Sequence, residues 1–305
     1  MTTLLITHPA CLDHNPGAMH PESPSRLRAI LKALEGPEFA DLLRREAPAA
    51  SVDQIARAHA RAYVTAVLKA VPPAGLVGLD ADTVISPGSG EAALRAAGAV
   101  VAGVDAVMTG EADNAFCAVR PPGHHAEAAR AMGFCLFNNV AIGAAHARAA
   151  HGLERVAVVD FDVHHGNGTQ HMFERDPGLF YASTHQWPLY PGTGDSDERG
   201  VGNVCNVPLP PMAGSREFRA AMETIVLPAL AAFRPDLLMV SAGFDAHAAD
   251  PLASLRLVEA DYDWATRALM AVADDCCEGR LVSTLEGGYD LPALAASAAA
   301  HLRAL

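Results

Sequence analysis

Residues 155–167 read RVAVVDFDVHHGN, an apolar run that leads directly into carboxylates and imidazoles. The run Arg155–Phe161 has the length and β-branched content of a strand buried on both faces, as in a parallel sheet. Other short apolar runs alternate with longer stretches of helical periodicity, which predicts an α/β fold with helices on both faces of a parallel sheet. The expected strands are Leu4–Thr7, Ala115–Val119, Arg155–Phe161, Leu179–Ser183, Leu237–Ser241 and Leu281–Leu285, and the expected helices are Glu91–Met108, Asn139–Ala150, Arg216–Phe233 and Ala260–Glu278.

The 305 residues contain no Ser/Gly linker, repeat or low-complexity tract, so we expect a single domain over residues 1–305. Three stretches rich in Gly, Pro, His or Asp are expected to be long irregular loops, namely Pro9–Ser25, Val71–Gly90 and His185–Pro211. Loops of this length in a compact domain usually shape a binding site.

The composition and charge of the chain limit the kinds of ligand and partner that it is expected to bind. Hydrophobic residues make up 50% and charged residues 19% of the chain, which is typical of a globular protein and excludes intrinsic disorder. The net charge of -13 disfavours nucleic acid and favours cationic or neutral ligands. The six cysteines include no C-x-x-C pair, so no disulfide framework is expected. Without a signal peptide or a membrane-spanning run, we expect a cytoplasmic protein with no membrane partner, as a monomer or a homo-oligomer.

Residues that can bind metals or transfer protons follow directly after the ends of the later predicted strands. They are His124 and His125 after AFCAV, Asp160 to His165 after RVAVV, Asp245 after LLMVSAGF, and Glu286 to Tyr289 after RLVSTL. Ligands bind outside the carboxyl ends of the strands in open parallel sheets, so these four segments are expected to converge on one pocket.

The pattern Asp160-x-Asp162-x-His164 has a period of two, which directs all three side chains to one side of an extended segment. Carboxylate and imidazole ligands suit Zn²⁺, and Asp245 from another strand would complete a three-ligand site that leaves room for water. A buried structural network of Asp and His is the alternative, and it is the commoner explanation for such a motif in isolation.

Imidazole exchanges protons near neutral pH, so the adjacent His124 and His125 are candidates for general acid and base. Tyr289 follows two glycines that allow close backbone approach, so its hydroxyl is a candidate for holding an oxyanion. Each feature alone also has a plain explanation, an incidental His-His pair or a turn followed by a core aromatic residue.

Several motifs together resemble the zinc-dependent histone deacetylases, in particular the class II group and its bacterial amidohydrolase relatives. The match runs nearly from end to end through His20-Pro-Glu-x-Pro-x-Arg26, His59 with Tyr63, RPPGHHAE, GFCLFNN, DFDVHHGNGTQHMF, LMVSAGFDAH and LEGGYD. The resemblance implies an arginase/deacetylase-like single α/β domain with a parallel sheet of about eight strands.

Position by position, the resemblance implies that Asp162, His164 and Asp245 bind zinc and that His124 and His125 are the catalytic pair. It further implies that Asp160 supports His124, that Asn167 supports His125, and that Tyr289 polarises the acetyl carbonyl. It also implies a structural potassium ion bound by Asp160, Asp162, His164, Ser183 and Thr184.

The resemblance also implies a narrow acyl-lysine channel with Phe134 and Tyr190 as walls and Gly133 leaving room for the alkyl chain. Relatives that prefer acetylated polyamines carry Glu where this chain has Leu252, so acetyl-lysine in proteins or peptides is the expected substrate. The alternatives are an acetylpolyamine or other small-amide amidohydrolase, a two-manganese arginase-like hydrolase, and a catalytically silent acetyl-lysine-binding scaffold.

Overall fold

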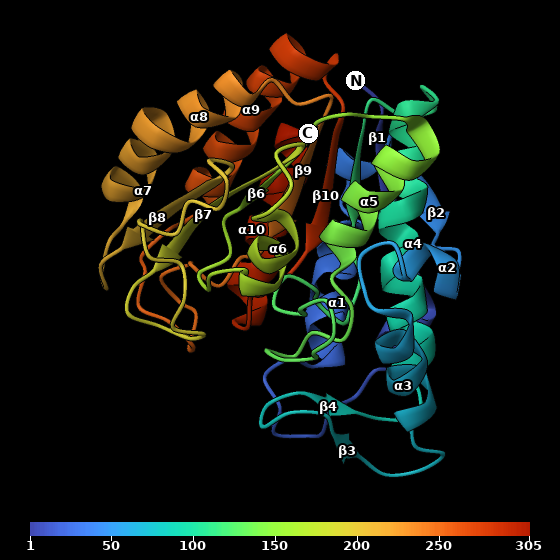
Figure 1. The fold of residues 1–305 in the computed structure, drawn as a ribbon. Coiled ribbons are helices and arrows are strands. Elements are labelled where there is room, and N and C mark those ends of the chain that lie inside the picture. Colours follow the sequence, from blue (N-terminus) through green and yellow to red (C-terminus); the bar gives the residue numbers. More distant parts are fainter.

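A computed structural model describes residues 1–305 and confirms the predicted α/β architecture, a parallel sheet between two layers of helices (Figure 1). The eight strands lie in the order β2-β1-β5-β10-β9-β6-β7-β8, and every neighbouring pair is parallel. The strands of this sheet are β1 Thr3–Thr7, β2 Leu43–Glu46, β5 Asn114–Cys117, β6 Val156–Asp160, β7 Leu179–Gln186, β8 Val204–Leu209, β9 Leu237–Ala242 and β10 Leu281–Leu285. A separate antiparallel hairpin consists of β3 Val77–Gly78 and β4 Val84–Ile85.

The helices cover the two faces of the sheet. α4, α5 and α6 lie on one face, and α1, α7, α8, α9 and α10 lie on the other (Figure 1). The helices are α1 Pro24–Ala33, α2 Val52–Ile55, α3 Arg61–Ala70, α4 Ser89–Met108, α5 Asn139–His151, α6 Asn167–Phe173, α7 Ser215–Ala221, α8 Leu227–Phe233, α9 Glu259–Cys277 and α10 Leu291–Ala304, with 3₁₀ turns at Pro9–Leu12 and Pro37–Phe39.

The central strands are buried on both faces, as their sequence predicts. Every residue of β6, β9 and β10 is buried, because helices cover both sides of each strand. One hydrophobic cluster of 69 buried residues includes side chains from all the central strands, so the sheet and both helical layers share one core. None of the helices combines the length and the apolar character that a membrane crossing requires.

The edge strands differ from the expectation. β8 lies within the stretch His185–Pro211, which the sequence predicts to be a loop, and β7 also extends into it as far as Gln186. Pro208 interrupts the strand pattern of β8, but an edge strand tolerates proline because the missing N–H can face away from the ladder. β2 has the polar sequence LRRE and is mostly exposed, so it shows no alternation of apolar residues.

The other expected loops also contain regular structure. Val71–Gly90 includes the hairpin of β3 and β4, and Pro9–Ser25 includes a 3₁₀ turn and the start of α1. The helix expected over Arg216–Phe233 is present but contains a π turn at Met222–Val226. Pro228 lacks the N–H of a regular helical hydrogen bond, and the wider turn that precedes it accommodates this loss.

Candidate active site

The chemically capable segments leave four adjacent strands. β5, β10, β9 and β6 are consecutive in the sheet, and they lead to His124, Tyr289, Asp245 and Asp162 respectively. In Figure 1 the loops that follow these strands lie at the end of the sheet away from both termini. The parallel topology therefore gathers the four segments at one carboxyl edge, as the sequence predicts.

Three potential ligand atoms meet at this edge, one each from Asp162, His164 and Asp245, and all lie within 4.8 Å of one another. His164 Nδ1 is 3.1 Å from Asp162 Oδ1 and 3.1 Å from Asp245 Oδ2. The other oxygen of each carboxylate accepts a backbone N–H, from Gly287 at 2.7 Å and from Val163 at 2.8 Å. Each carboxylate thus directs one oxygen toward the same point as the imidazole.

Glycines make this convergence possible. A Cβ atom at Gly243 would lie 2.0 Å from Asp162 Oδ2, and a Cβ atom at Gly287 would lie 2.1 Å from Asp245 Oδ2. No side chain fits at these distances, so the loops after β9 and β10 can approach the carboxylates only because they carry glycine there.

The charges of the cluster favour a cation. Burial, and after it the neighbouring charge of Asp162, raise the pKa of Asp245 to about 7, so an unpaired carboxylate charge is disfavoured here. Burial lowers the pKa of His164, but hydrogen bonds to both carboxylates outweigh it and raise that pKa to about 10. A divalent metal would neutralise both carboxylates, so the residues present fit such an ion.

The tandem histidines have different partners. His124 Nδ1 lies 2.9 Å from Asp160 Oδ2, and His125 Nδ1 lies 2.9 Å from Asn167 Oδ1. Asn167 donates from Nδ2 to Glu127 Oε1 at 3.0 Å, which orients its amide oxygen toward His125. His125 therefore donates its Nδ1–H to Asn167 and keeps an unprotonated Nε2.

The same contacts separate the pKa values of the two rings. Burial lowers the pKa of His124, but the carboxylates of Asp160 and Asp162 outweigh it and hold that pKa well above the ordinary value. Burial and the neighbouring charges of His124 and His164 hold the pKa of His125 well below its ordinary value. One imidazole is thus disposed to be charged and the other to be neutral.

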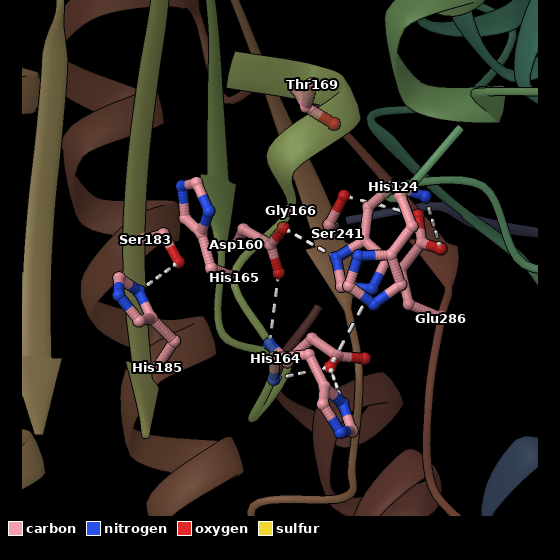
Figure 2. A network of polar contacts seen from close by, with 12 residues as sticks. His124, Asp160, His164, His165, Gly166, Thr169, Ser183, His185, Ser241 and Glu286 are labelled. Atoms are coloured by element: carbon pink, nitrogen blue, oxygen red, sulfur yellow. Dashed lines mark hydrogen bonds and ion pairs between the residues drawn. The ribbon is translucent and has the colours of Figure 1, made fainter. Parts of the chain in front are cut away.

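Glu286 holds the backbone of His124 in position (Figure 2). Its carboxylate accepts the backbone N–H groups of Gly123 at 2.6 Å and of His124 at 3.1 Å, and its other oxygen accepts from the hydroxyl of Ser241 at 3.3 Å. These bonds tie the turn after β5 to the ends of β9 and β10, which fixes the backbone that carries the tandem pair.

A cavity of about 200 Å³ opens from these residues to the surface. Gly133, Phe134, Tyr190 and Leu252, which the family resemblance assigns to a channel, all line it. The full lining is Asp82, Pro122, His124, His125, Gly133, Phe134, His164, Leu189, Tyr190, Leu252, Gly287 and Tyr289.

The aromatic rings define the walls of this cavity. The Phe134 and Tyr289 rings meet edge to face, with centroids 5.9 Å apart, and the Tyr190 ring is 5.2 Å from the His125 ring. Tyr190 is 40% exposed, which places it at the mouth. A Cβ atom at Gly133 would lie 2.3 Å from His125 Cδ2, so glycine keeps this wall clear of the imidazole.

Two carboxylates that the sequence does not single out hold residues of this cavity, and one of them, Asp82, also lines it. Asp250 accepts the backbone N–H of Tyr289 at 2.7 Å and that of Leu252 at 3.0 Å, so it positions both. Asp82 lines the mouth and accepts the N–H of Gly133 at 3.1 Å. Both residues lie in loops, and only the position of Asp250, two residues before Leu252, could have singled it out.

A buried ion-pair network is formed by Glu22, Arg26 and Arg120. The sequence motifs contain these residues but give no indication that they pair. Glu22 pairs with both arginines, and Arg26 donates to the backbone carbonyls of Glu286 and Gly288. The Arg26 guanidinium also lies 4.8 Å from the centre of the Tyr289 ring. This network braces the Gly-Gly-Tyr segment from the amino-terminal part of the chain.

The residues expected around potassium lie on two neighbouring strands and the loop that follows one of them. Asp160 at the end of β6 is paired in register with Ser183 of β7, and Thr184 is the next residue of that strand. Ser183 Oγ is 2.9 Å from His185 Nδ1. Asp162 and His164 continue the chain beyond β6.

Comparisons with known proteins find similarity over almost the whole chain. A family model described as "Histone deacetylase domain" matches residues 20–305. The chloroplastic histone deacetylase 14 of Arabidopsis thaliana is 40% identical, over 99% of this chain and 76% of its own length. The histone deacetylase-like amidohydrolase of Pseudomonas aeruginosa is 45% identical, over 89% of this chain and 73% of its own length. The solved structure of the HDA15 HD domain matches with a TM-score of 0.93 at 37% identity, covering 99% of this chain and 87% of that chain.

Proposed function

This chain belongs to the histone deacetylase family of deacetylases and amidohydrolases, and we propose that it is a zinc-dependent deacetylase acting on acetyl-lysine in proteins or peptides. The observation that carries the proposal is the buried Asp162, His164 and Asp245 group at the base of a cavity that also holds two imidazoles and a phenol. When bound, zinc would polarise the acetyl carbonyl and acidify the attacking water, whose pKa on zinc can fall to about 7.

His125 is the base in this proposal. Its neutral ring keeps Nε2 free because Nδ1–H is engaged by Asn167, so Nε2 takes the proton of the attacking water. His124, charged beside Asp160, supplies positive potential near the developing negative charge. His125 then returns its proton to the nitrogen as the C–N bond breaks, which releases acetate and a free amine.

Tyr289 donates its hydroxyl hydrogen to the carbonyl oxygen as that oxygen becomes negative. Burial is the largest cause that raises the pKa of Tyr289 well above its ordinary value, so the phenol stays protonated and able to donate. Asp250 holds the backbone N–H of Tyr289, and the Arg26 guanidinium lies 4.8 Å from the centre of its ring.

The cavity favours a linear, uncharged acyl-amine stem. Phe134 and Tyr190 flank the path and Leu252 adds an apolar side chain, so the alkyl stem of acetyl-lysine is desolvated along the way. Asp82 at the mouth and the net charge of -13 favour a cationic group just outside it. Asp82 supports the second candidate function, hydrolysis of an acetylated polyamine.

We further propose that Asp160, Asp162, His164, Ser183 and Thr184 hold a structural potassium ion. The support is their adjacency on β6 and β7, with backbone oxygens on a segment that also carries two of the zinc ligands. Such an ion would stiffen the backbone behind Asp162 and His164 and so hold the ligands in position.

A substrate panel tests the proposal. Acetyl-lysine peptides and acetylated polyamines should be assayed after chelation and after zinc is restored, with acetate release as the readout. We expect zinc-dependent turnover that is fastest on the peptides. Fastest turnover of a polyamine would favour the second candidate, and peptide binding without any acetate release would favour the silent scaffold.

A further inference from the structure

A second group of three potential metal ligands lies outside the active site. It consists of Asp105, near the end of α4, and His146 and His151, in the second half of α5, and we call it the peripheral cluster. The two helices pack side by side (Figure 1). One ligand atom from each side chain lies within 4.8 Å of the others.

The two imidazoles are aimed at one carboxylate oxygen. Asp105 Oδ1 lies 2.7 Å from His146 Nε2 and 2.7 Å from His151 Nε2. Tetrahedral zinc sites need ligand atoms roughly 3.3 Å apart, so the cluster would open by roughly 0.6 Å at each contact. The Asp105 side chain is 48% exposed and can make this adjustment, and its open side leaves room for water as a further ligand.

The active-site group provides an internal comparison. There the imidazole of His164 also lies directly against carboxylate oxygens, at 3.1 Å. In both groups, imidazole nitrogens and carboxylate oxygens lie closer together than they would around a bound metal. The peripheral cluster has two imidazoles and one carboxylate, whereas the active-site group has one imidazole and two carboxylates.

We propose that the peripheral cluster is a second binding site for a divalent transition-metal cation, with Zn²⁺ as the reference ion. Imidazole-rich sites with one carboxylate select zinc, copper or nickel over magnesium and calcium, which prefer all-oxygen ligands. The site has fewer anionic ligands and more solvent exposure than the active site, so it binds the ion more weakly.

Arg57 competes with the metal. Its guanidinium donates to His146 Nδ1, so that nitrogen is an acceptor and the ring carries its proton on Nε2. Metal binding at Nε2 requires the proton to move to Nδ1 and Arg57 to withdraw. The exposed Arg57 side chain can turn into solvent, and the change leaves His146 neutral throughout.

The peripheral cluster is separate from the catalytic chemistry. Asn139, the first residue of α5, bonds to Pro121 in the turn that carries His124. At 1.5 Å per residue, His146 and His151 lie roughly 10 and 18 Å further along the helix axis. The occupancy of the two sites can therefore be changed independently.

Zinc titration of the metal-free full chain tests the proposal, with calorimetry to count the sites and deacetylase activity measured in parallel. We expect two classes of site in the unaltered chain. Asp105→Asn and His151→Gln should each lose only the weaker class and keep activity. Asp245→Asn should lose the tight class and activity and keep the weaker class.

Two further variants sharpen the result. His171→Gln removes an exposed histidine from α6 and should retain both classes of site. Arg57→Gln should tighten the weaker class roughly tenfold or more, because a hydrogen bond from a charged donor no longer competes. A single class of site in the unaltered chain, or a weaker class that survives in Asp105→Asn, would overturn the proposal. Absence of deacetylase activity alone would count against the proposed function and not against this site.

Discussion

Tyr289 and Leu252 owe their positions in the cavity to one carboxylate. Asp250 accepts the backbone N–H groups of both residues, although one of them is its near neighbour in the chain and the other belongs to the loop after β10. In the proposed function these two residues meet the acetyl carbonyl and the substrate stem, and one carboxylate holds the backbone of both.

Removal of the Tyr289 hydroxyl tests its role as an oxyanion donor. In Tyr289→Phe we expect kcat to fall by about 10² to 10³, because the lost contact forms only as charge develops on the oxygen. Zinc content and Tm should stay unchanged. Tyr190→Phe removes a phenol from the mouth of the same cavity and should retain nearly full kcat; equal losses in both variants would deny Tyr289 a special role.

Leu252 contributes an uncharged side chain to the wall of the cavity. A carboxylate here could pair with a second ammonium of a polyamine, so Leu252→Glu should shift kcat/KM toward the acetylated polyamine by about ten- to a hundredfold relative to an acetyl-lysine peptide. In Leu252→Gln the new side chain has nearly the same shape as glutamate but no charge, so we expect little shift in this ratio of kcat/KM values. A matching shift in the glutamine variant would mean that size, and not charge, sets the preference.

At the level of elements, β10 and α10 are joined through a buried histidine. His301 of α10 lies 2.9 Å from the Ser283 hydroxyl of β10 and 2.7 Å from the Thr266 hydroxyl of α9. Burial lowers the pKa of His301 to about 3, because the packed ring has no charged partner. The helical layer behind the active-site strand therefore depends on a neutral imidazole.

This histidine makes stability sensitive to acid. The folded-state pKa of His301 lies below the unfolded value of about 6.5, so the unfolded chain takes up the proton first and stability falls as pH drops below 6.5. By pH 5 the loss is about 2 kcal/mol from this residue, and it continues toward pH 3. Denaturant unfolding of His301→Gln should show a flatter pH dependence between pH 6.5 and 5. The exposed His171→Gln should keep the steeper dependence, and identical slopes in all three proteins would contradict the assignment.

For the molecule as a whole, the sheet order brings the site together. β5, β10, β9 and β6 are neighbours although their order in the chain is β5, β6, β9, β10, so each crossover carries the chain to a strand whose carboxyl end completes the same pocket. Two carboxylates and two further buried acidic groups, Asp160 and Glu286, are concentrated there. A metal ion held by Asp162, His164 and Asp245, as proposed above, would tie the segments after β6 and β9 together in the middle of the sheet.

Metal removal should therefore weaken the entire fold. In the Asp105→Asn background, which isolates the active site, chelation should lower Tm by several degrees and zinc should restore it, because a ligand that binds only the folded state stabilises by an amount that grows with its concentration. The doubly substituted Asp105→Asn/Asp245→Ala chain should show no such response in thermal unfolding. A chelator effect that persists in this chain would place the stabilising ion elsewhere.

Local sequence was sufficient to predict the central strands and the α/β fold, and it placed the candidate residues directly after those strands. The physical reason is that both signals are local: a strand buried on two faces must be apolar throughout, and the residues that come after it are adjacent in the chain, as in Val156–Asp160 and the nearby Asp162 and His164. The edge strands β2 and β8 lack this signal, because a strand with a neighbour on one side only accepts Arg, Asn and Pro.

Beyond the four segments that follow the central strands, only the packing of the folded chain decided which loops meet. Asp250 and Asp82 accept backbone N–H groups of cavity residues far away in the chain, and such bonds depend on distance in space and not on the type of the donor residue. The same holds for the peripheral cluster, where Asp105 and His151 come from two helices whose packing sets a 2.7 Å contact. Spacing along a chain specifies a strand and the residues directly after it, whereas contacts between crossovers arise only when the sheet has placed them side by side.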